Sequence, residues 1–214
     1  MDASQQIVSY IRQNKISTTE VADCLGKTGL FENAYAVVPG MFRVGKVKWV
    51  YAYHNSNWSI HEQIRDVQPG QIVMIEAFGC ENRATVGALV AKYILLYRQA
   101  EAIISNANMR DGNDLLKERY AVWCRGFSPI GCYNTKNKEP LDPMIYNQHY
   151  HKYEGSIAVC DDSGVVLVPK ELQTDGFLKK LHEIEDQEDI WFECLDHKKW
   201  NTYDIVCGKK YLHE

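Results

Sequence analysis

The chain has 214 residues, of which 45% are hydrophobic and 24% are charged, and its formal net charge is −4 at pH 7. This length and composition are sufficient for one globular domain with a complete hydrophobic core. The slightly acidic balance argues against generic nucleic-acid binding, because electrostatic attraction to a polyanion needs an excess of basic residues.

The N-terminal sequence and the cysteine usage predict a cytoplasmic protein without a membrane segment. The first residues contain no basic segment followed by an apolar stretch, so we expect no signal peptide. The apolar runs are far shorter than the roughly 20 residues needed to cross a bilayer. The seven cysteines are scattered and form no Cys-x-x-Cys pair, which favours reduced thiols over disulfides or a zinc site.

Strands that alternate with helices in the middle of the chain, followed by a hairpin, predict an α/β fold with a mixed sheet. A capping box within residues 16–23, where a Ser or Thr precedes an acid by three residues, marks one helix start. Helices are expected over 3–14, 59–67 and 84–99, and a charged helix over 170–195. Two further helices are expected to begin within 16–23 and at Leu115. The expected strands are 44–53, 71–77, 102–106, 122–126, 155–160 and 165–168.

Arg110 and Asp111 follow the predicted strand 102–106 and are the strongest candidates for a functional site. Since ligand crevices in open α/β sheets lie at the C-terminal ends of the strands, this pair and the loop after Gly79 should face one pocket. That loop leads into a predicted helix, whose first N–H groups can bind an anion. A carboxylate that can hold a hard cation, beside a guanidinium that can grip a carboxylate or oxyanion, predicts a site for a small carboxylate and a divalent metal.

An ordered set of short motifs resembles the RraA-like family. That family includes class II pyruvate aldolases, such as 4-hydroxy-4-methyl-2-oxoglutarate aldolase, and the regulator of ribonuclease activity A. The similar segments are 16–26, 67–75, 83–91, 108–111, 125–129 and 161–169. Asn57 and His61 also stand where the family usually has an asparagine and a histidine at that spacing. The resemblance covers about residues 16–169, and a charged helix and an aromatic tail, 170–214, lie beyond it.

The resemblance implies a single domain over residues 1–214 with a layered β/β/α fold, in a homotrimer or hexamer. It also implies a metal-dependent lyase acting on a 2-oxo acid, by retro-aldol cleavage that gives pyruvate or by decarboxylation of the oxaloacetate type. Asp111 would contact Mg²⁺ or Mn²⁺, and Arg110 would stabilise the oxyanion of the enolate. The implied substrate-binding residues are Asn57, His61, Gly87, Ala88, Leu89, Val90 and Arg110.

Ala88 is the main departure from the family pattern. The aldolases usually have an acidic residue at this position, directly after the glycine, where it holds metal-bound water. Glu81 or Glu76 could replace that acid from the preceding loop and strand. In the family, an acid of the C-terminal helix can also reach the metal-bound water of a neighbouring subunit, and Glu188 is the best candidate for that role.

Smaller departures concern the crossover and a later loop. The crossover from the glycine motif to the Arg-Asp pair is about one residue longer than usual. Where the aldolases carry a lysine after the Arg-Gly segment, a gap-free count reaches Asn134, and Lys136 is close by. His149 and His151 have a spacing that could chelate a metal on a strand, but their tyrosine-rich surroundings favour a polar loop.

Two alternatives to the lyase remain open. The first is a non-catalytic RraA-type regulator that binds a protein partner such as a ribonuclease or helicase. That regulator usually lacks the acid after the arginine, whereas Asp111 is present here. The second is an RraA-like enzyme with altered chemistry on a sugar-derived oxo acid, which the missing acid at Ala88 would permit.

Overall fold

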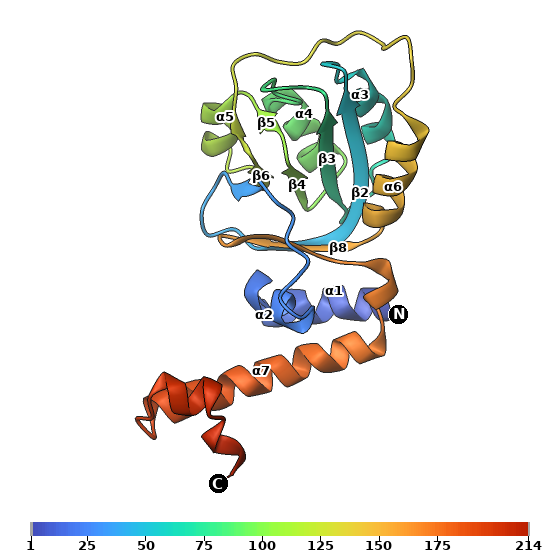
Figure 1. The fold of residues 1–214 in the computed structure, drawn as a ribbon. Helices are drawn as coiled ribbons and strands as arrows, with labels where there is room; N and C mark the ends of the chain where they lie inside the picture. Colours follow the sequence, from blue (N-terminus) through green and yellow to red (C-terminus); the bar gives the residue numbers. More distant parts are fainter. Residues whose placement is uncertain (1, 214) are drawn as a thin grey trace.

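The computed structural model describes residues 2–213, whose arrangement is shown in Figure 1. Seven strands form one mixed sheet in the order β1-β6-β4-β3-β2-β8-β9, and β5 pairs with β7 separately. The strands are β1 (Tyr35–Ala36), β2 (Arg43–Tyr53), β3 (Ile72–Phe78), β4 (Ala102–Ser105), β5 (Asn108–Met109), β6 (Val122–Cys124), β7 (Gly126–Phe127), β8 (Ile157–Asp161) and β9 (Gly164–Val168).

The α-helices are α1 (Ala3–Asn14), α2 (Thr18–Cys24), α3 (Trp58–Gln63), α4 (Ala88–Lys92), α5 (Gly112–Lys117), α6 (Pro143–Tyr153) and α7 (Asp175–Asp196). Shorter 3₁₀ or π-helical turns are η1 (Ile64–Asp66), η2 (Tyr93–Tyr97), η3 (Lys170–Leu172), η4 (Tyr203–Cys207) and η5 (Lys210–Leu212). No helix among residues 2–213 combines the length and the apolar composition that a bilayer-spanning segment requires.

β2 joins the two parts of the sheet. Its first residues pair antiparallel with β8, beginning at Arg43 opposite Cys160, and its remainder pairs parallel with β3. The strands β3, β4 and β6 continue the parallel part, so their C-terminal ends meet at one edge. β1 and β9 are the two outer strands of the sheet, and Leu30, which shortly precedes β1, bridges to Val166 of β9. The mixed sheet is therefore nearly closed. The mixed α/β fold predicted from the sequence is therefore confirmed.

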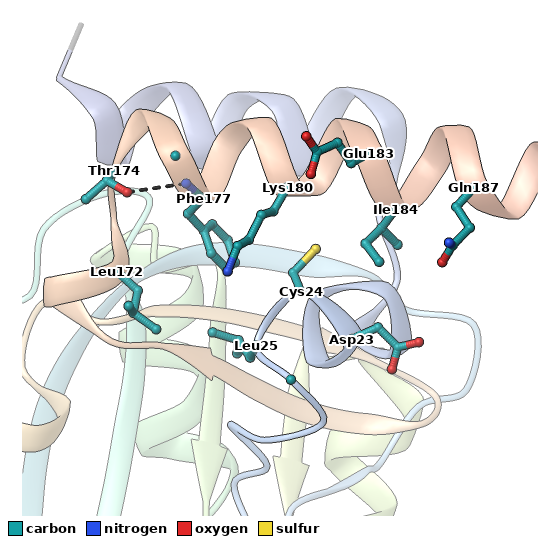
Figure 2. A pocket seen from close by; sticks show the side chains of 12 residues that line it. Asp23, Cys24, Leu25, Leu172, Thr174, Phe177, Lys180, Glu183, Ile184 and Gln187 are labelled. Atoms are coloured by element: carbon teal, nitrogen blue, oxygen red, sulfur yellow. Dashed lines mark hydrogen bonds between the residues drawn. The ribbon is translucent and has the colours of Figure 1, made fainter. Parts of the chain in front are cut away.

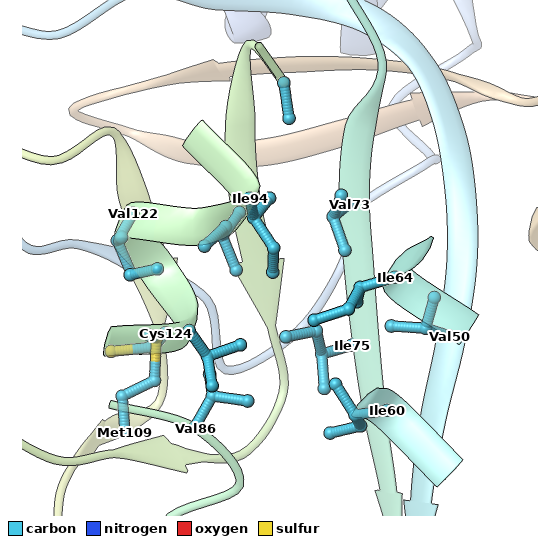
Figure 3. Packing of buried hydrophobic residues seen from close by; sticks show 14 of the residues in the cluster. Val50, Ile60, Ile64, Val73, Ile75, Val86, Ile94, Met109, Val122 and Cys124 are labelled. Atoms are coloured by element: carbon cyan, nitrogen blue, oxygen red, sulfur yellow. The ribbon is translucent and has the colours of Figure 1, made fainter. Parts of the chain in front are cut away.

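Successive residues of β3 face different hydrophobic cores, because side chains alternate along a strand. Val73 and Ile75 pack with Ile60 of α3 and Ile94 of η2 on the outer face of the parallel strands (Figure 3). The intervening Met74 belongs to the core on the inner face of the curved sheet. A third cluster lies where α1, α2 and α7 cover β8 and β9, at the opposite end of the molecule from α3, α4 and α5 (Figure 1).

The predicted capping box is present at the start of α2. The Ser17 hydroxyl accepts a hydrogen bond from Glu20 N–H at 3.2 Å, and the Glu20 carboxylate accepts one from Ser17 N–H at 2.7 Å. We expect Ser17→Ala to lower the free energy of unfolding by about 1 kcal/mol, since it removes the cap acceptor. Denaturant titration measures this loss. Thr19→Ala, an exposed change in the same helical turn, should leave the transition nearly unchanged.

The helix predicted over 84–99 starts four residues later, at Ala88. Residues 84–87 are extended because Ala84 bridges to both Asn108 and Gly131, and Thr85 N–H donates to the Asn108 carbonyl at 2.9 Å. The helix then continues as the π-helical turn η2, in which Arg98 N–H bonds to the Tyr93 carbonyl. A π-helical turn takes up an additional residue, which suits the longer crossover predicted from the sequence.

The segment around His149 and His151 is also different from the prediction. It is the helix α6 rather than a polar loop or a strand, so the two histidines are not placed as a strand chelate. The sequence signal for this helix is Asp142 followed by Pro143, because an N-cap acid and a proline in the first turn favour helix initiation. The Asp142 carboxylate accepts a hydrogen bond from Met144 N–H at 2.7 Å.

Candidate functional site

A small cavity of about 110 Å³ lies at the C-terminal edge of the parallel strands. Four segments supply its walls: the start of α3, the extended segment with the first turn of α4, the Arg110–Asp111 pair after β5, and the loop 131–134. The lining residues are Asn57, His61, Ala84, Thr85, Val86, Gly87, Leu89, Val90, Arg110, Asp111, Gly131, Cys132 and Asn134. The edge of the sheet predicted from the sequence is therefore where the structure brings these residues together.

Asp111 caps the cavity from the start of α5. Its backbone is left-handed, with φ at 61°, which turns the chain sharply away from β5. The Oδ2 atom accepts a hydrogen bond from Ala88 N–H at 3.0 Å, so the carboxylate is tied to the first turn of α4. Within residues 2–213, Asp111 Oδ1 receives no such bond. The carboxylate is thus anchored through one oxygen and has the other available for a ligand.

Arg110 passes between two glycines. A Cβ atom at Gly87 would lie 2.8 Å from Arg110 Cγ, and one at Gly131 would lie 3.1 Å from Nη1. The guanidinium is 3.8 Å from Asp111 Oδ2 and donates no hydrogen bond to another residue in the described range 2–213. Its backbone N–H donates to the Val86 carbonyl at 3.0 Å. The arrangement leaves a positioned cation with free donors beside a carboxylate, which can bind an anionic ligand bidentately.

Asn57 and His61 complete one wall from α3. Asn57 is buried, and its side-chain N–H₂ group donates to the Thr85 carbonyl at 2.8 Å. Its Oδ1 atom is buried without a hydrogen-bond donor among residues 2–213. His61 is exposed and faces the same cavity. Asn57 therefore supports the extended segment, while the His61 ring is available to a ligand.

The first turn of α4 offers fewer free amides than a simple anion cradle would. Ala88 N–H is occupied by Asp111, while the N–H groups of Leu89 and Val90 belong to a first turn that has no acceptor within the helix. The Leu89 side chain is 82% exposed. The carboxylate binding predicted for the backbone of 87–90 would therefore depend mainly on the N–H groups of Leu89 and Val90.

The acids considered as substitutes for the one missing at Ala88 lie elsewhere. Glu76 is buried on the inner side of the sheet, where Trp49 Nε1 donates to it at 2.8 Å and His149 Nδ1 lies 2.7 Å away. Glu81 is exposed in the turn after β3 and lies outside the cavity lining. Glu188 lies on α7 near α2. Its pKa is raised, mainly by partial burial and to a lesser degree by the negative charges of nearby acids.

A second cavity of about 460 Å³ adjoins the first and shares His61 and Asn134 with it. Its other lining residues are Trp58, Glu62 and Arg65. The sequence interpretation missed Trp58 and Arg65, although both lie within a few residues of His61 on the same helical segment. Lys136 lines neither cavity, so Asn134 is the residue of that loop that faces the site.

A larger cavity, about 720 Å³, is an open groove between α2 and α7 at the other end of the molecule. Figure 2 shows Cys24 and Leu25 on one side of it, facing Phe177 and Lys180 of α7. The dashed line marks the N-cap bond from Phe177 N–H to the Thr174 hydroxyl, 3.3 Å long. The groove shares no residue with the cavity at Asp111.

A resident divalent metal would have Asp111 as its one protein carboxylate in the small cavity. No group of three or more His, Cys, Asp or Glu side chains among residues 2–213 is arranged to hold a metal ion. Mg²⁺ is commonly bound by only one or two carboxylates, with water and substrate oxygens in its other positions. The available Oδ1 atom of Asp111 fits that mode of binding.

The chain belongs to the RraA-like family: the family model described as Aldolase/RraA matches residues 18–167. This family includes aldolase members and inhibitors of ribonucleases. The predicted resemblance over about 16–169 is therefore confirmed.

Solved structures share the fold at low sequence identity. An uncharacterized protein from Pseudomonas syringae pv. tomato has a TM-score of 0.70 at 20% identity, over 90% of this chain and 89% of that one. RraAS2 from Streptomyces coelicolor, described as an unusual member of the RNase ES inhibitor RraA family, has 0.64 at 17%, over 86% and 96%. The RNA-processing inhibitor RraA from Thermus thermophilus has 0.55 at 15%, over 72% and 93%. These likenesses establish the fold and leave the activity to the residues of the site.

Proposed function

We propose that this protein is a divalent-metal-dependent lyase that cleaves a small 2-oxo acid. The observation that carries the proposal is the pairing of Arg110 and Asp111 in one small cavity, with free guanidinium donors and a free carboxylate oxygen. Cleavage of such an acid creates a pyruvate enolate, whose negative charge needs a positively charged site. The pair is partly exposed, and two glycines, Gly87 and Gly131, leave the room that the Arg110 side chain occupies beside the cavity.

Each group of the cavity has a role in this reaction. Asp111 would hold Mg²⁺ or Mn²⁺, and such a metal, when bound, polarises the 2-oxo carbonyl as a Lewis acid. Arg110 binds the oxygen on which the enolate charge develops, and the Leu89 and Val90 amides bind the carboxylate at the positive end of α4. In retro-aldol cleavage the 4-hydroxyl loses its proton, the C3–C4 bond breaks, and its electron pair enters the enolate, which is then protonated at C3.

Because Ala88 stands where the aldolases have an acid, another group must remove the 4-hydroxyl proton. His61 is a titratable side chain of the same cavity and would be the base. We further propose that the protein is a homotrimer or hexamer in which Glu188 of a neighbouring copy approaches the site through water. Within one chain Glu188 cannot do so, because α7, which carries it, lies at the opposite end of the molecule from α5, which begins at the site (Figure 1). Decarboxylation of an oxaloacetate-type acid needs no such base, since carbon dioxide leaves directly.

The adjoining cavity accounts for the rest of the substrate. The small cavity, about 110 Å³, is below the usual size of a ligand pocket. It would therefore hold only the pyruvyl part of the substrate. The part of the substrate beyond C3 would extend past His61 toward Trp58 and Arg65. An aromatic face and a guanidinium there suit a polar or acidic leaving group.

The direct test follows pyruvate release from 4-hydroxy-2-oxo acids and from oxaloacetate, with Mg²⁺, with Mn²⁺ and with excess chelator. We expect turnover that requires the metal and returns when metal is restored after chelation. Reactions with metal but no protein provide the baseline, because oxaloacetate loses carbon dioxide slowly by itself. Absence of metal-dependent turnover with every substrate would exclude the lyase, and a stable complex with a ribonuclease or helicase would then favour the regulator.

A further inference from the structure

Two cysteine side chains from distant parts of the chain meet beside the candidate site. Cys80 lies in the turn after β3 and is buried, with 2% of its surface exposed. Cys132 lies in the loop that lines the small cavity and is partly exposed. The two thiols lie close enough for each to shift the pKa of the other. Both side chains also pack in the hydrophobic cluster beneath α3 and α4.

Backbone hydrogen bonds hold the two cysteine-bearing segments together. Cys132 N–H donates to the Ala84 carbonyl at 2.9 Å, and Ala84 N–H donates to the Ile130 carbonyl at 2.8 Å. Arg83 N–H donates to the Cys80 carbonyl at 3.0 Å, which closes the turn that carries Cys80. The thiol contact is therefore fixed by the local fold rather than by two freely moving loops.

Arg83 places a positive charge next to this pair. Its Nη1 donates to the Gly131 carbonyl at 3.1 Å, and its guanidinium carbon lies 4.6 Å from the centre of the Tyr133 ring. The Nε atom is buried without an acceptor among residues 2–213. A buried guanidinium N–H without a hydrogen-bond partner destabilises the folded state. A thiolate nearby would offset part of this destabilisation, because its negative charge attracts the guanidinium.

The electrostatic environment makes the pair more acidic than an ordinary buried thiol. The pKa of Cys80 is lowered, mainly because the Cys132 thiol donates a hydrogen bond to it, with a contribution from Arg83. The same hydrogen bond, together with burial, raises the pKa of Cys132. Because the two sulfurs share the remaining proton, the anion belongs to the pair and can form on either sulfur.

Other cysteines lack this environment. Burial raises the pKa of Cys24 and of Cys124 to about 11, and it also raises the pKa of the fully buried Cys160. Cys207 is exposed in the C-terminal region. Since the thiolate is the reactive form, burial makes the first three unreactive and separates them from the pair at the cavity.

We propose that Cys80 and Cys132 form a redox-sensitive dithiol, which a peroxide converts into an intramolecular disulfide at the wall of the cavity. The Cys80 thiolate first takes the proton of the Cys132 thiol. The Cys132 sulfur, which belongs to a partly exposed residue that lines the cavity, then attacks one peroxide oxygen as the anion, and the O–O bond breaks. This gives the sulfenic acid of Cys132 and one water, once the leaving hydroxide takes up a proton. The Cys80 thiol then loses its proton and attacks the Cys132 sulfur, which forms the S–S bond and releases a second water.

The disulfide would alter the wall of the cavity that faces Arg110. Cys132 follows Gly131, where an added Cβ would lie 3.1 Å from Arg110 Nη1, so a shift of Cys132 toward Cys80 moves the backbone next to Nη1. This inference does not depend on the proposed reaction, because the disulfide forms or fails to form whatever ligand the cavity binds. If the lyase proposal also holds, oxidation should lower turnover, and reduction should restore it.

The test uses the full chain carrying Cys207→Ser, which removes the exposed cysteine and with it disulfides between molecules. After treatment with hydrogen peroxide and alkylation, we expect peptide mapping without reductant to find a peptide that links Cys80 to Cys132. The protein should lose two titratable thiols and regain both with dithiothreitol. Phenylarsine oxide, which captures adjacent thiols, should protect both cysteines from alkylation before oxidation.

Further variants make the outcome decisive. In Cys132→Ser and in Cys132→Ala the linked peptide should disappear, and the arsenical should no longer protect Cys80. Cys124→Ala serves as the matched control, since it also removes a thiol from the same hydrophobic cluster but should leave the linked peptide in place. Oxidation of Cys132 to a sulfinic or sulfonic acid without a link to Cys80 would overturn the proposal. A second result would also overturn it. In the unmodified chain, oxidation of Cys207 shows that the peroxide has acted, and Cys80 and Cys132 would both still be fully alkylated after that treatment.

Discussion

Replacement of Asp111 by asparagine should reduce metal-dependent turnover at least about 100-fold, because loss of an outer-shell partner alone costs a metal site up to that factor. The substitution removes one negative charge and keeps nearly the same shape. Asparagine tolerates the left-handed backbone that Asp111 adopts, and its side-chain oxygen can still accept the bond from Ala88 N–H. Steady-state kinetics at several metal concentrations measures the loss, and thermal unfolding should change little.

Asp114→Asn is the matched control for this prediction. Asp114 is exposed in the first turn of the same helix, and its carboxylate does not line the cavity. The control therefore removes the same charge from the same helix without touching the site, and turnover should stay close to that of the unmodified protein. Equal activity of Asp111→Asn and Asp114→Asn would show that the carboxylate at 111 takes no part in the reaction.

Local sequence signals were sufficient for much of the fold. The alternation in β2 and the apolar run of β3 predicted both strands, because each pattern reports which faces of a strand are buried. The capping box predicted the start of α2, since its two hydrogen bonds join residues only three positions apart. Signals of this kind depend on neighbours along the chain, so they can be read before the tertiary structure is known.

Elements that depend on distant partners were predicted less well. Residues 84–87 include two β-branched residues and a glycine, which form helices poorly, and they are extended because β5 and the loop at Gly131 supply their hydrogen bonds. The sequence near residues 84–87 does not indicate that Asn108 and Gly131 are their partners. The helix α6 was missed for a different reason: its tyrosines and histidines lack a clear apolar stripe, and the Asp142–Pro143 start was overlooked.

The candidate site shows the same division. Arg110 and Asp111 could be placed at the edge of the sheet from the sequence, because they follow a buried strand. The direction of Glu76 depends on the register of β3, which turns it toward Trp49 and away from the cavity. The bond from Ala88 N–H to Asp111 joins the starts of two helices that are far apart in sequence, so it could be found only in the structure.

Gly87→Ala should lower turnover by about 100-fold with the fold intact, since a displacement of about 1 Å in a catalytic group can cost that much. The backbone at Gly87 is extended, with φ at −133°, so alanine causes no backbone strain. The added Cβ would instead lie 2.3 Å from Asp111 Oδ2 and 2.8 Å from Arg110 Cγ. Because both contacts are far too short, the carboxylate and the guanidinium must move apart, and the bond to Ala88 N–H must lengthen. Kinetics and a metal titration measure the effect.

Gly176→Ala separates this displacement from the general effect of replacing a glycine. Gly176 lies in the first turn of α7, where a Cβ would meet only the Thr174 hydroxyl, at an ordinary 3.5 Å. Alanine there should raise stability by about 0.5–1 kcal/mol, because it reduces the entropy lost when the helix forms, and turnover should not change. If Gly87→Ala were as active as Gly176→Ala, the close approach of segment 84–87 to Arg110 and Asp111 would have no catalytic purpose. A loss of turnover confined to Gly87→Ala would instead mean that the spacing between the first turn of α4 and the Arg-Asp pair sets the geometry of the site.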